Sequence, residues 1–303
     1  METFATDAAG AKGAAGEARL KGSAARLSIA AAAFLILLKS ATGWLTGSIS
    51  VWASLLDSAM DIFASVINFY ALRAAARPPD EDHRYGHGKA ESLAGLFQSF
   101  VICASGGFLL YEAARRILTP RPTAQEWLGV GTMAVACGVS FALVARLRRV
   151  ARKTDSPALA ADAAHYATDV YTNGAALFAL LLVAVTGWTL ADPLISITIS
   201  CLILHSAYEV ARDSVHVLMD RRLPRAVDAK VAAVVGRFRP EGVLGFHDLR
   251  TRRSGSVKFI DLHLEVEGRK TLQEAHDLTV RVLRAIQQEI PRSRVQIHTD
   301  PAE

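Results

Sequence analysis

The chain has 303 residues, of which 51% are hydrophobic, 7% aromatic and 21% charged, and its formal net charge is +5. The apolar excess is aliphatic and the mean hydropathy is +0.24, so an apolar part and a polar part are joined in one chain. This balance excludes a disordered chain and a wholly soluble enzyme. The three cysteines lie far apart and form neither a disulfide framework nor a CxxC metal motif. Because basic residues mark the cytoplasmic loops of membrane proteins, the positive charge predicts no nucleic-acid partner.

Six stretches are long and apolar enough to cross a bilayer as helices, which takes about 20 residues each. We predict these spans at Leu27–Leu45, Ile49–Ala71, Ser92–Ala114, Trp127–Val144, Leu159–Trp188 and Leu190–Val210. The Ala- and Gly-rich start has no clear cleavage site, so we interpret it as a disordered tail rather than a signal peptide. The predicted organisation is a tail at 1–25, a transmembrane domain at 26–213, a linker at 214–223 and a soluble metal-binding domain at 224–303.

Lysine and arginine are concentrated in the loops on one side of these spans. That side carries Lys12, Arg19, Lys21, Arg26, Arg73, Arg77, Arg84, Lys89, Arg146, Arg148, Arg149, Arg152 and Lys153. The other side carries only Arg115, Arg116 and Arg121. Because basic loops stay in the cytoplasm, we predict a multi-pass protein of the inner (plasma) membrane with both termini in the cytoplasm.

The soluble domain shows helical and strand-like periodicity in turn. Helical spacing covers Ala226–Phe238 and Leu272–Ile290, whereas alternation typical of strands covers Val243–Arg252, Ser256–Val266 and Val295–His298. The predicted order is therefore α-β-β-α-β, a small α+β domain with helices on a sheet.

Two predicted spans carry pairs of ionisable residues four positions apart: Asp57 with Asp61, and His165 with Asp169. A carboxylate in mid-bilayer costs about 2.5–3.5 kcal/mol on insertion scales, so each should face a partner or water. The spacing puts each pair on one helix face, and three carboxylates with one imidazole suit Zn²⁺ or a similar divalent ion. The alternative interpretation is that these are scattered polar residues that only form hydrogen bonds between helices. Asp162, one turn before His165, could be a headgroup-level or supporting carboxylate.

Two polar regions contain further candidate ligands. In the loop after the second span, Asp80, His83 and His87 could close on a metal ion, although a solvated loop explains the same residues. The soluble domain holds His247, His263, His276 and His298, together with Asp300. Neutral imidazole is the commonest metal ligand, but exposed surface histidines are the alternative.

Several motifs in order resemble those of the cation diffusion facilitator transporters, and of their bacterial zinc and ferrous-iron efflux subgroup in particular. The resembling segments are TGSISVWASLLDSAMD, HRYGHGKAESLAGL, HYATDVYTNGA, HDLRTRRSG and IHTDP. The resemblance covers nearly the whole chain after the N-terminal tail. It implies six spans followed by a cytoplasmic α-β-β-α-β domain.

The resemblance also implies three groups of metal ligands and one dimer contact. The transport site would comprise Asp57, Asp61, His165 and Asp169, and the loop site Asp80, His83 and His87. A binuclear cytoplasmic site would comprise His247, His263, His276, His298 and Asp300, with Asp300 as the bridge. A salt bridge between Lys89 and Asp220 would hold a homodimer. Because Glu81 and Asp82 follow Asp80, which carboxylate joins the loop histidines is left open.

We therefore predict a secondary transporter, not an enzyme, that exports divalent cations in exchange for protons. Zn²⁺ is the expected cargo, Cd²⁺ and Fe²⁺ are alternatives, and no organic cofactor is expected. An intramembrane metalloenzyme would need HExxH or an equivalent pair, which the chain lacks. A membrane-anchored metal sensor is the main alternative, but it does not explain the carboxylates inside the bilayer.

Overall fold

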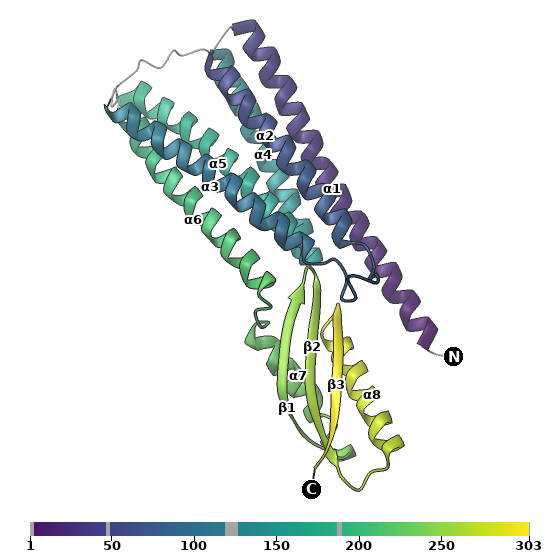
Figure 1. Cartoon of the computed structure of the whole chain (residues 1–303). Helices are drawn as coiled ribbons and strands as arrows, with labels where there is room; N and C mark the ends of the chain where they lie inside the picture. Colours follow the sequence, from purple (N-terminus) through teal and green to yellow (C-terminus); the bar gives the residue numbers. More distant parts are fainter. Residues whose placement is uncertain (1–2, 47–48, 119–126, 187–189, 303) are drawn as a thin grey trace. The chain divides into compact units, whose positions relative to one another are not determined.

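The computed structural model describes residues 3–46, 49–118, 127–186 and 190–302. The chain divides into two compact units, Met1–Val215 and His216–Glu303. The point of division lies within the predicted linker. The first unit is helical, and the second combines helices with a three-stranded sheet (Figure 1).

Long helices make up the first part of the chain (Figure 1). They are α1 (Thr3–Thr46), α2 (Ile49–Ala75), α3 (Ala90–Leu118), α4 (Trp127–Thr154), α5 (Pro157–Thr186) and α6 (Ala191–Leu218). α1 packs along α2, α4 packs along α5, and α5 also contacts α2 and α3. Each predicted span corresponds to one helix. Most of the helices are longer than the predicted spans because their polar ends continue the same backbone hydrogen bonding.

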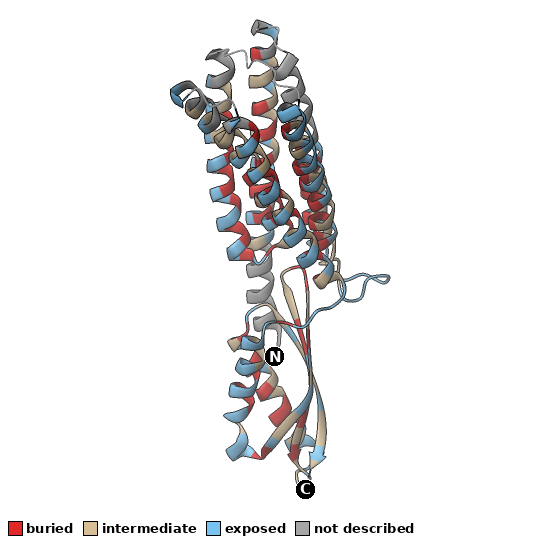
Figure 2. Ribbon diagram, turned by 90° about the vertical axis from the view of Figure 1, so that its left-hand side faces the viewer, coloured by how far each residue is buried: buried red, intermediate tan, exposed pale blue. Residues whose placement is uncertain are grey.

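The outward faces of these helices are apolar. Leu37, Phe100, Phe108 and Phe141 are 66–70% exposed, and Figure 2 shows buried and exposed residues alternating along the helices. Such an extensive apolar exterior requires a covering of lipid or protein. Three described stretches are long and apolar enough to span a membrane: Gly16–Thr42, Ala90–Arg115 and Pro193–Leu218. The other predicted spans fall on α2, α4 and α5, which contain residues whose side chains are not described.

The N-terminal residues differ from the predicted disordered tail, because α1 begins at Thr3 and continues without a break into the first span. Alanine, which is abundant here, has the highest helix propensity. Lys21 is buried, and its Nζ lies 2.5 Å from Oε1 of Glu91 on α3. Ala24 and Ala25 are buried as well. The charges of this stretch suggested solvent exposure, but the ion pair with a distant carboxylate allows Lys21 to be buried.

The second unit has the predicted α-β-β-α-β order. It consists of α7 (Arg225–Gly236), the 3-10 helix η1 (Arg239–Glu241), β1 (Val243–Ser254), β2 (Val257–Glu267), α8 (Leu272–Glu289) and β3 (Ser293–Ala302). β2 is central, antiparallel to β1 and parallel to β3. Leu262 and Leu264 of β2 pack in the core with Leu278 and Val282 of α8. β3 is longer than the predicted Val295–His298, since its pairing with β2 runs the full length of the strand.

Candidate metal transport and binding sites

The two predicted ligand pairs of the membrane helices meet at one contact. His165 Nε2 on α5 lies 2.8 Å from Asp61 Oδ1 on α2. The two side chains are 2% and 10% exposed, so the contact is buried between the helices. The other ring nitrogen of His165, Nδ1, is buried and has no hydrogen-bond partner among the described residues. An imidazole and a carboxylate in this position are both suitable Zn²⁺ ligands.

The remaining two predicted ligands flank this contact along the backbone. Asp57 lies on α2 one turn before Asp61, but its side chain is outside the described residues. Asp169 lies on α5 one turn after His165 and is half-buried. Their spacing places them on the same helix faces as Asp61 and His165. The four-ligand set stays a prediction, and the structure describes the contact between two of its members, Asp61 and His165.

Buried polar residues continue from this contact between α1, α2 and α5. Ser65 Oγ lies 2.9 Å from the hydroxyl oxygen of Tyr166, and the Tyr166 hydroxyl donates to the Ser28 carbonyl at 3.2 Å. The Ser28 hydroxyl donates to Oδ2 of Asp162 at 2.7 Å. Asp162 is 1% exposed. It is therefore a buried carboxylate bonded to α1, not a solvent-exposed group at the end of the bundle.

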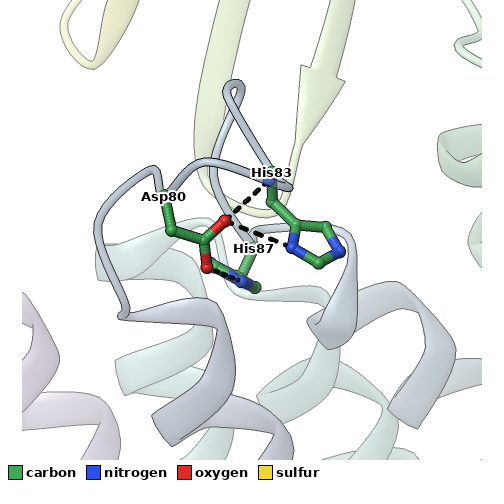
Figure 3. Close-up of side chains that lie close together, drawn as sticks. All are labelled: Asp80, His83 and His87. Carbon is green, nitrogen blue, oxygen red and sulfur yellow. Dashed lines mark hydrogen bonds and ion pairs between the residues drawn. The ribbon is translucent and has the colours of Figure 1, made fainter.

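The loop between α2 and α3 brings together Asp80, His83 and His87 (Figure 3). Asp80 Oδ1 lies 3.3 Å from His83 Nδ1, and Asp80 Oδ2 lies 3.1 Å from His87 Nε2. The backbone N–H of His83 also donates to Asp80 at 2.6 Å, and this bond lowers the pKa of the Asp80 carboxyl. One ligand atom from each residue lies within 4.8 Å of the others. Of the three adjacent acidic residues, Asp80 is the one that meets the histidines.

Three histidines form a row across the sheet of the second unit. His247 of β1 pairs with His263 of β2, which pairs with His298 of β3. All three surround Asp300: His263 Nδ1 and His247 Nε2 lie 2.9 and 3.2 Å from Oδ2, and His298 Nε2 lies 3.2 Å from Oδ1. Asp300 follows His298 by two residues, so both side chains are on one face of β3. His298 is 67% exposed, so this row is an open surface cluster.

The electrostatics of the row favour a bound cation. The hydrogen bond with His263 lowers the pKa of the Asp300 carboxyl, which keeps it ionised at neutral pH. β1 is irregular beside the row, with a register shift after His247 and a left-handed φ of 48° at Asp248. Bulges of this kind re-aim side chains next to functional sites. Here the Asp248 carboxylate lies 4.0 Å from Nε2 of His263.

His276 does not join this row within one chain. It lies on α8, which packs against the face of the sheet formed by Leu262 and Leu264. Since side chains alternate along a strand, His263 points to the opposite face of β2. Across the described residues, His276 makes no contact with the row. One chain therefore assembles four of the five predicted cytoplasmic ligands.

Lys89 and Asp220 belong to different units, so their predicted salt bridge stays a prediction. Within the second unit, Asp220 Oδ1 lies 3.4 Å from Nη1 of Arg252. The guanidinium of Arg252 also lies over the Phe259 ring, 4.3 Å from its centroid. No sequence motif identified Arg252 as a partner of Asp220. By contrast, helical spacing from Asp61 could have identified Ser65 as a residue of the same buried face.

Comparison with known proteins decides the family. The cation efflux transmembrane domain matches residues 25–219, and the cation efflux protein cytoplasmic domain matches residues 223–302. The chain belongs to the cation diffusion facilitator family of cation efflux proteins. It is 42% identical to the cation-efflux pump FieF of Salmonella newport (strain SL254) over 283 residues, 93% of each chain. It is also 42% identical to FieF of Yersinia pestis (strain Pestoides F) over 284 residues, 94% of each chain.

A solved structure of CzrB in a zinc form is 37% identical, covers 27% of this chain and 92% of that chain, and has a TM-score of 0.25. The two family matches confirm the predicted fold class, a helical transmembrane domain followed by a cytoplasmic α+β domain. This member of the cation diffusion facilitator family is thus a membrane transporter of cations, and its second unit is the family's cytoplasmic dimerisation domain.

Proposed function

We propose that this cation diffusion facilitator exports Zn²⁺ in exchange for protons, with Cd²⁺ and Fe²⁺ as alternative cargoes. The buried contact between Asp61 and His165, at 2.8 Å, is the observation that carries the proposal. Ionisable groups inside a membrane bundle are costly and therefore mark ion or proton pathways. A carboxylate and an imidazole are also the ligands that Zn²⁺ readily accepts.

In the proposed cycle, Asp57, Asp61, His165 and Asp169 hold either the metal ion or protons. The ligands must be deprotonated to bind metal, so an arriving metal ion releases protons and arriving protons release the metal ion. Because Asp61 and His165 lie on different helices, a relative movement of α2 and α5 would change the ligand geometry. Alternation between inward-open and outward-open states then couples the two fluxes.

The proposed orientation places both termini in the cytoplasm and the protein in the inner membrane. At the end of α4, the side chains of Arg148, Arg149 and Arg152 are all exposed, as expected for a helix end in water. Arg115 lies on the opposite, less basic side. Its Nη1 lies 3.9 Å from the Glu112 carboxylate, which reduces the local excess of positive charge.

For the cytoplasmic domain, we propose a regulatory metal site in a homodimer. His247, His263, His298 and Asp300 would bind metal on the sheet surface. His276, which lies on the other face of its own domain, would have to act on metal bound by a second copy. Metal held in this way would bias the equilibrium between transporter conformations.

Zinc flux into proteoliposomes tests the transport site. Asp61→Asn and His165→Ala should each lower the flux by at least about 100-fold, since even the partners of metal ligands contribute about 10–100-fold. His205→Ala is the matched control, because His205 is another membrane-helix histidine with a 69% exposed side chain. Wild-type flux in a well-expressed Asp61→Asn protein would contradict the proposal, and a membrane-anchored sensor would move no metal in any variant.

A further inference from the structure

The polar residues between α1, α2 and α5 include buried atoms that the proposed transport site leaves without a role. Oδ2 of Asp162 accepts the Ser28 hydroxyl, but Oδ1 has no hydrogen-bond partner among the described residues. Asn68 of α2 lies close to Asp162 and is 4% exposed. Among the described residues, neither its amide nitrogen nor its amide oxygen has a partner at normal hydrogen-bond geometry. Buried polar atoms are nearly always satisfied, so unbonded atoms gathered in one place indicate a bound water or ion.

The charge of Asp162 gives the same indication. No lysine or arginine pairs with it in the part of the chain that the structure describes. Lys21 lies seven residues before Ser28 on α1, but its Nζ is held by Glu91 at 2.5 Å. A buried carboxylate without a cationic partner is strongly unfavourable. Asp162 is therefore expected to take up either a cation or a proton from outside the protein in at least one state of the transporter.

The position of these residues relates them to the transport site. Among the described contacts between α2 and α5, Asp61 lies against His165 and Ser65 against Tyr166, and Asn68, further along α2, lies close to Asp162. Asp162 precedes His165 by three residues, or about 5 Å along the helix axis. The Asn68–Asp162 pair is thus displaced from the transport site towards the N-terminus of α5. The proposed orientation puts that end of α5 on the cytoplasmic side.

We propose that Asp162, Asn68 and Ser28 form a second cation subsite, which holds the incoming divalent ion before Asp61 and His165 bind it. This inference rests on the proposed transport function. The subsite offers only oxygen donors, namely a carboxylate, an amide and a hydroxyl. Such hard donors suit a cation that keeps some of its water, and they favour Zn²⁺ less than an imidazole does. Weak binding is appropriate here, because an ion must leave each site along a conduction path. The subsite sets the rate of loading, and His165 sets the preference for the metal.

The test uses the full-length protein with Zn²⁺ alone as the probe. Asp162→Asn keeps the side-chain shape but removes the charge. In proteoliposomes it should raise the KM for Zn²⁺ about tenfold and change kcat much less. By calorimetry, the solubilised Asp162→Asn protein should bind one weakly held Zn²⁺ ion fewer per chain than the wild type. It should keep the ion of the transport site, which is the ion that Asp61→Asn removes. Asp162→Glu should restore most of the KM. Asp213→Asn, an exposed carboxylate on α6, is the matched control.

A second variant keeps the inference testable if Asp162→Asn folds poorly. Asn68→Ala removes a neutral ligand and should raise KM in the same direction. Wild-type KM together with full zinc stoichiometry in both variants would overturn the subsite. A shifted pH profile without loss of an ion would also overturn it, because Asp162 would then carry a proton instead of metal. Loss of both ions with early thermal unfolding would indicate a structural role and overturn it too.

The same measurements separate this inference from the transport proposal. If Asp61→Asn abolishes flux while Asp162→Asn and Asn68→Ala are silent, only the subsite is wrong. If Asp61→Asn itself leaves flux unchanged, the transport site is wrong, and the subsite loses the site that it is meant to load.

Discussion

The membrane contact and the cytoplasmic histidine row combine the same two ligand types in opposite surroundings. His165 and Asp61 meet at 2.8 Å with the histidine 2% exposed, whereas His298 and Asp300 meet at 3.2 Å with the histidine 67% exposed. Inside the bundle, the ligands are buried and must be deprotonated to bind metal, so protons and metal compete for the site. On the sheet, water can replace the metal, so occupancy can follow the metal concentration. The first setting suits transport and the second suits sensing.

The two sites also differ in how their ligands are held. Asp61 and His165 lie on separate helices, so their distance depends on helix packing. The row of His247, His263 and His298 lies on three hydrogen-bonded strands with a continuous register between β2 and β3. We therefore expect the geometry of the membrane site to change during the cycle, while the geometry of the row stays constant.

The largest expected effect is at the membrane site. Asp57→Ala and Asp169→Ala should abolish zinc flux while the protein still folds and inserts, because each removes a proposed ligand of the transport site and ionisable residues in membrane helices usually mark ion pathways. Flux into vesicles, normalised to inserted protein, measures this. Near-normal flux in either variant would remove that residue from the site.

His165→Asp should change selectivity rather than abolish transport. It replaces the one nitrogen ligand of the site with oxygen, which makes the site harder and lowers the preference for Zn²⁺ relative to Cd²⁺ and Mn²⁺. Competitive uptake of the three metals in vesicles measures the ratio. It should also alter the pH profile of transport, since an imidazole is lost. If ratio and profile both match the wild type, His165 is not a transport ligand.

The cytoplasmic row should show a moderate effect. In the unit 216–303, Asp300→Asn should weaken Zn²⁺ binding about 10–100-fold by calorimetry. The pKa of the Asp300 carboxyl is lowered from 3.8. Its negative charge therefore contributes to Zn²⁺ binding at any pH above 3.8 and is lost only as the pH falls below 3.8. Loss of affinity at any higher pH must therefore come from groups other than the Asp300 carboxyl. A wild-type unit that binds no Zn²⁺ would refute the regulatory site.

A smaller effect is expected at the predicted dimer contact. Lys89→Glu or Asp220→Lys should each lower the fraction of dimer, and the double variant should restore part of it, because reversing one partner leaves an unpaired charge. Since Arg252 also contacts Asp220 at 3.4 Å, restoration should be incomplete. Sedimentation of the solubilised protein measures the ratio of monomer to dimer. Identical ratios in all three variants and the wild type would exclude the pairing.

The smallest effect belongs to the exposed loop. Asp80→Asn should remove a weakly bound ion and change zinc flux less than about threefold, because Asp80 and His83 are solvated and water can replace the metal. Asp82→Asn is the matched control, as an adjacent exposed carboxylate outside the cluster. Equal zinc binding by the two variants would show that the Asp80 contacts do not hold metal.

Features with a local physical cause could be predicted from the sequence. Apolar runs of about 20 residues predict helices that cross a bilayer, and alternation predicts strands, so the six helices and the α-β-β-α-β order followed directly. The four-residue spacing of Asp57 with Asp61, and of His165 with Asp169, places each pair on one face before any packing is known. The ordered motifs were enough to predict the family.

Other features depended on which distant residues meet in space. Lys21 is buried because Glu91, seventy positions later, pairs with it, and no local pattern records that partner. Likewise, only the folded loop selects Asp80 over Asp82, and only the packing of α8 separates His276 from the histidine row. The burial of Asp162 against Ser28 of α1 is of the same kind. Hydropathy and periodicity describe neighbours along the chain, whereas the charge balance of a buried group depends on side chains that only tertiary packing brings within a few ångströms of it.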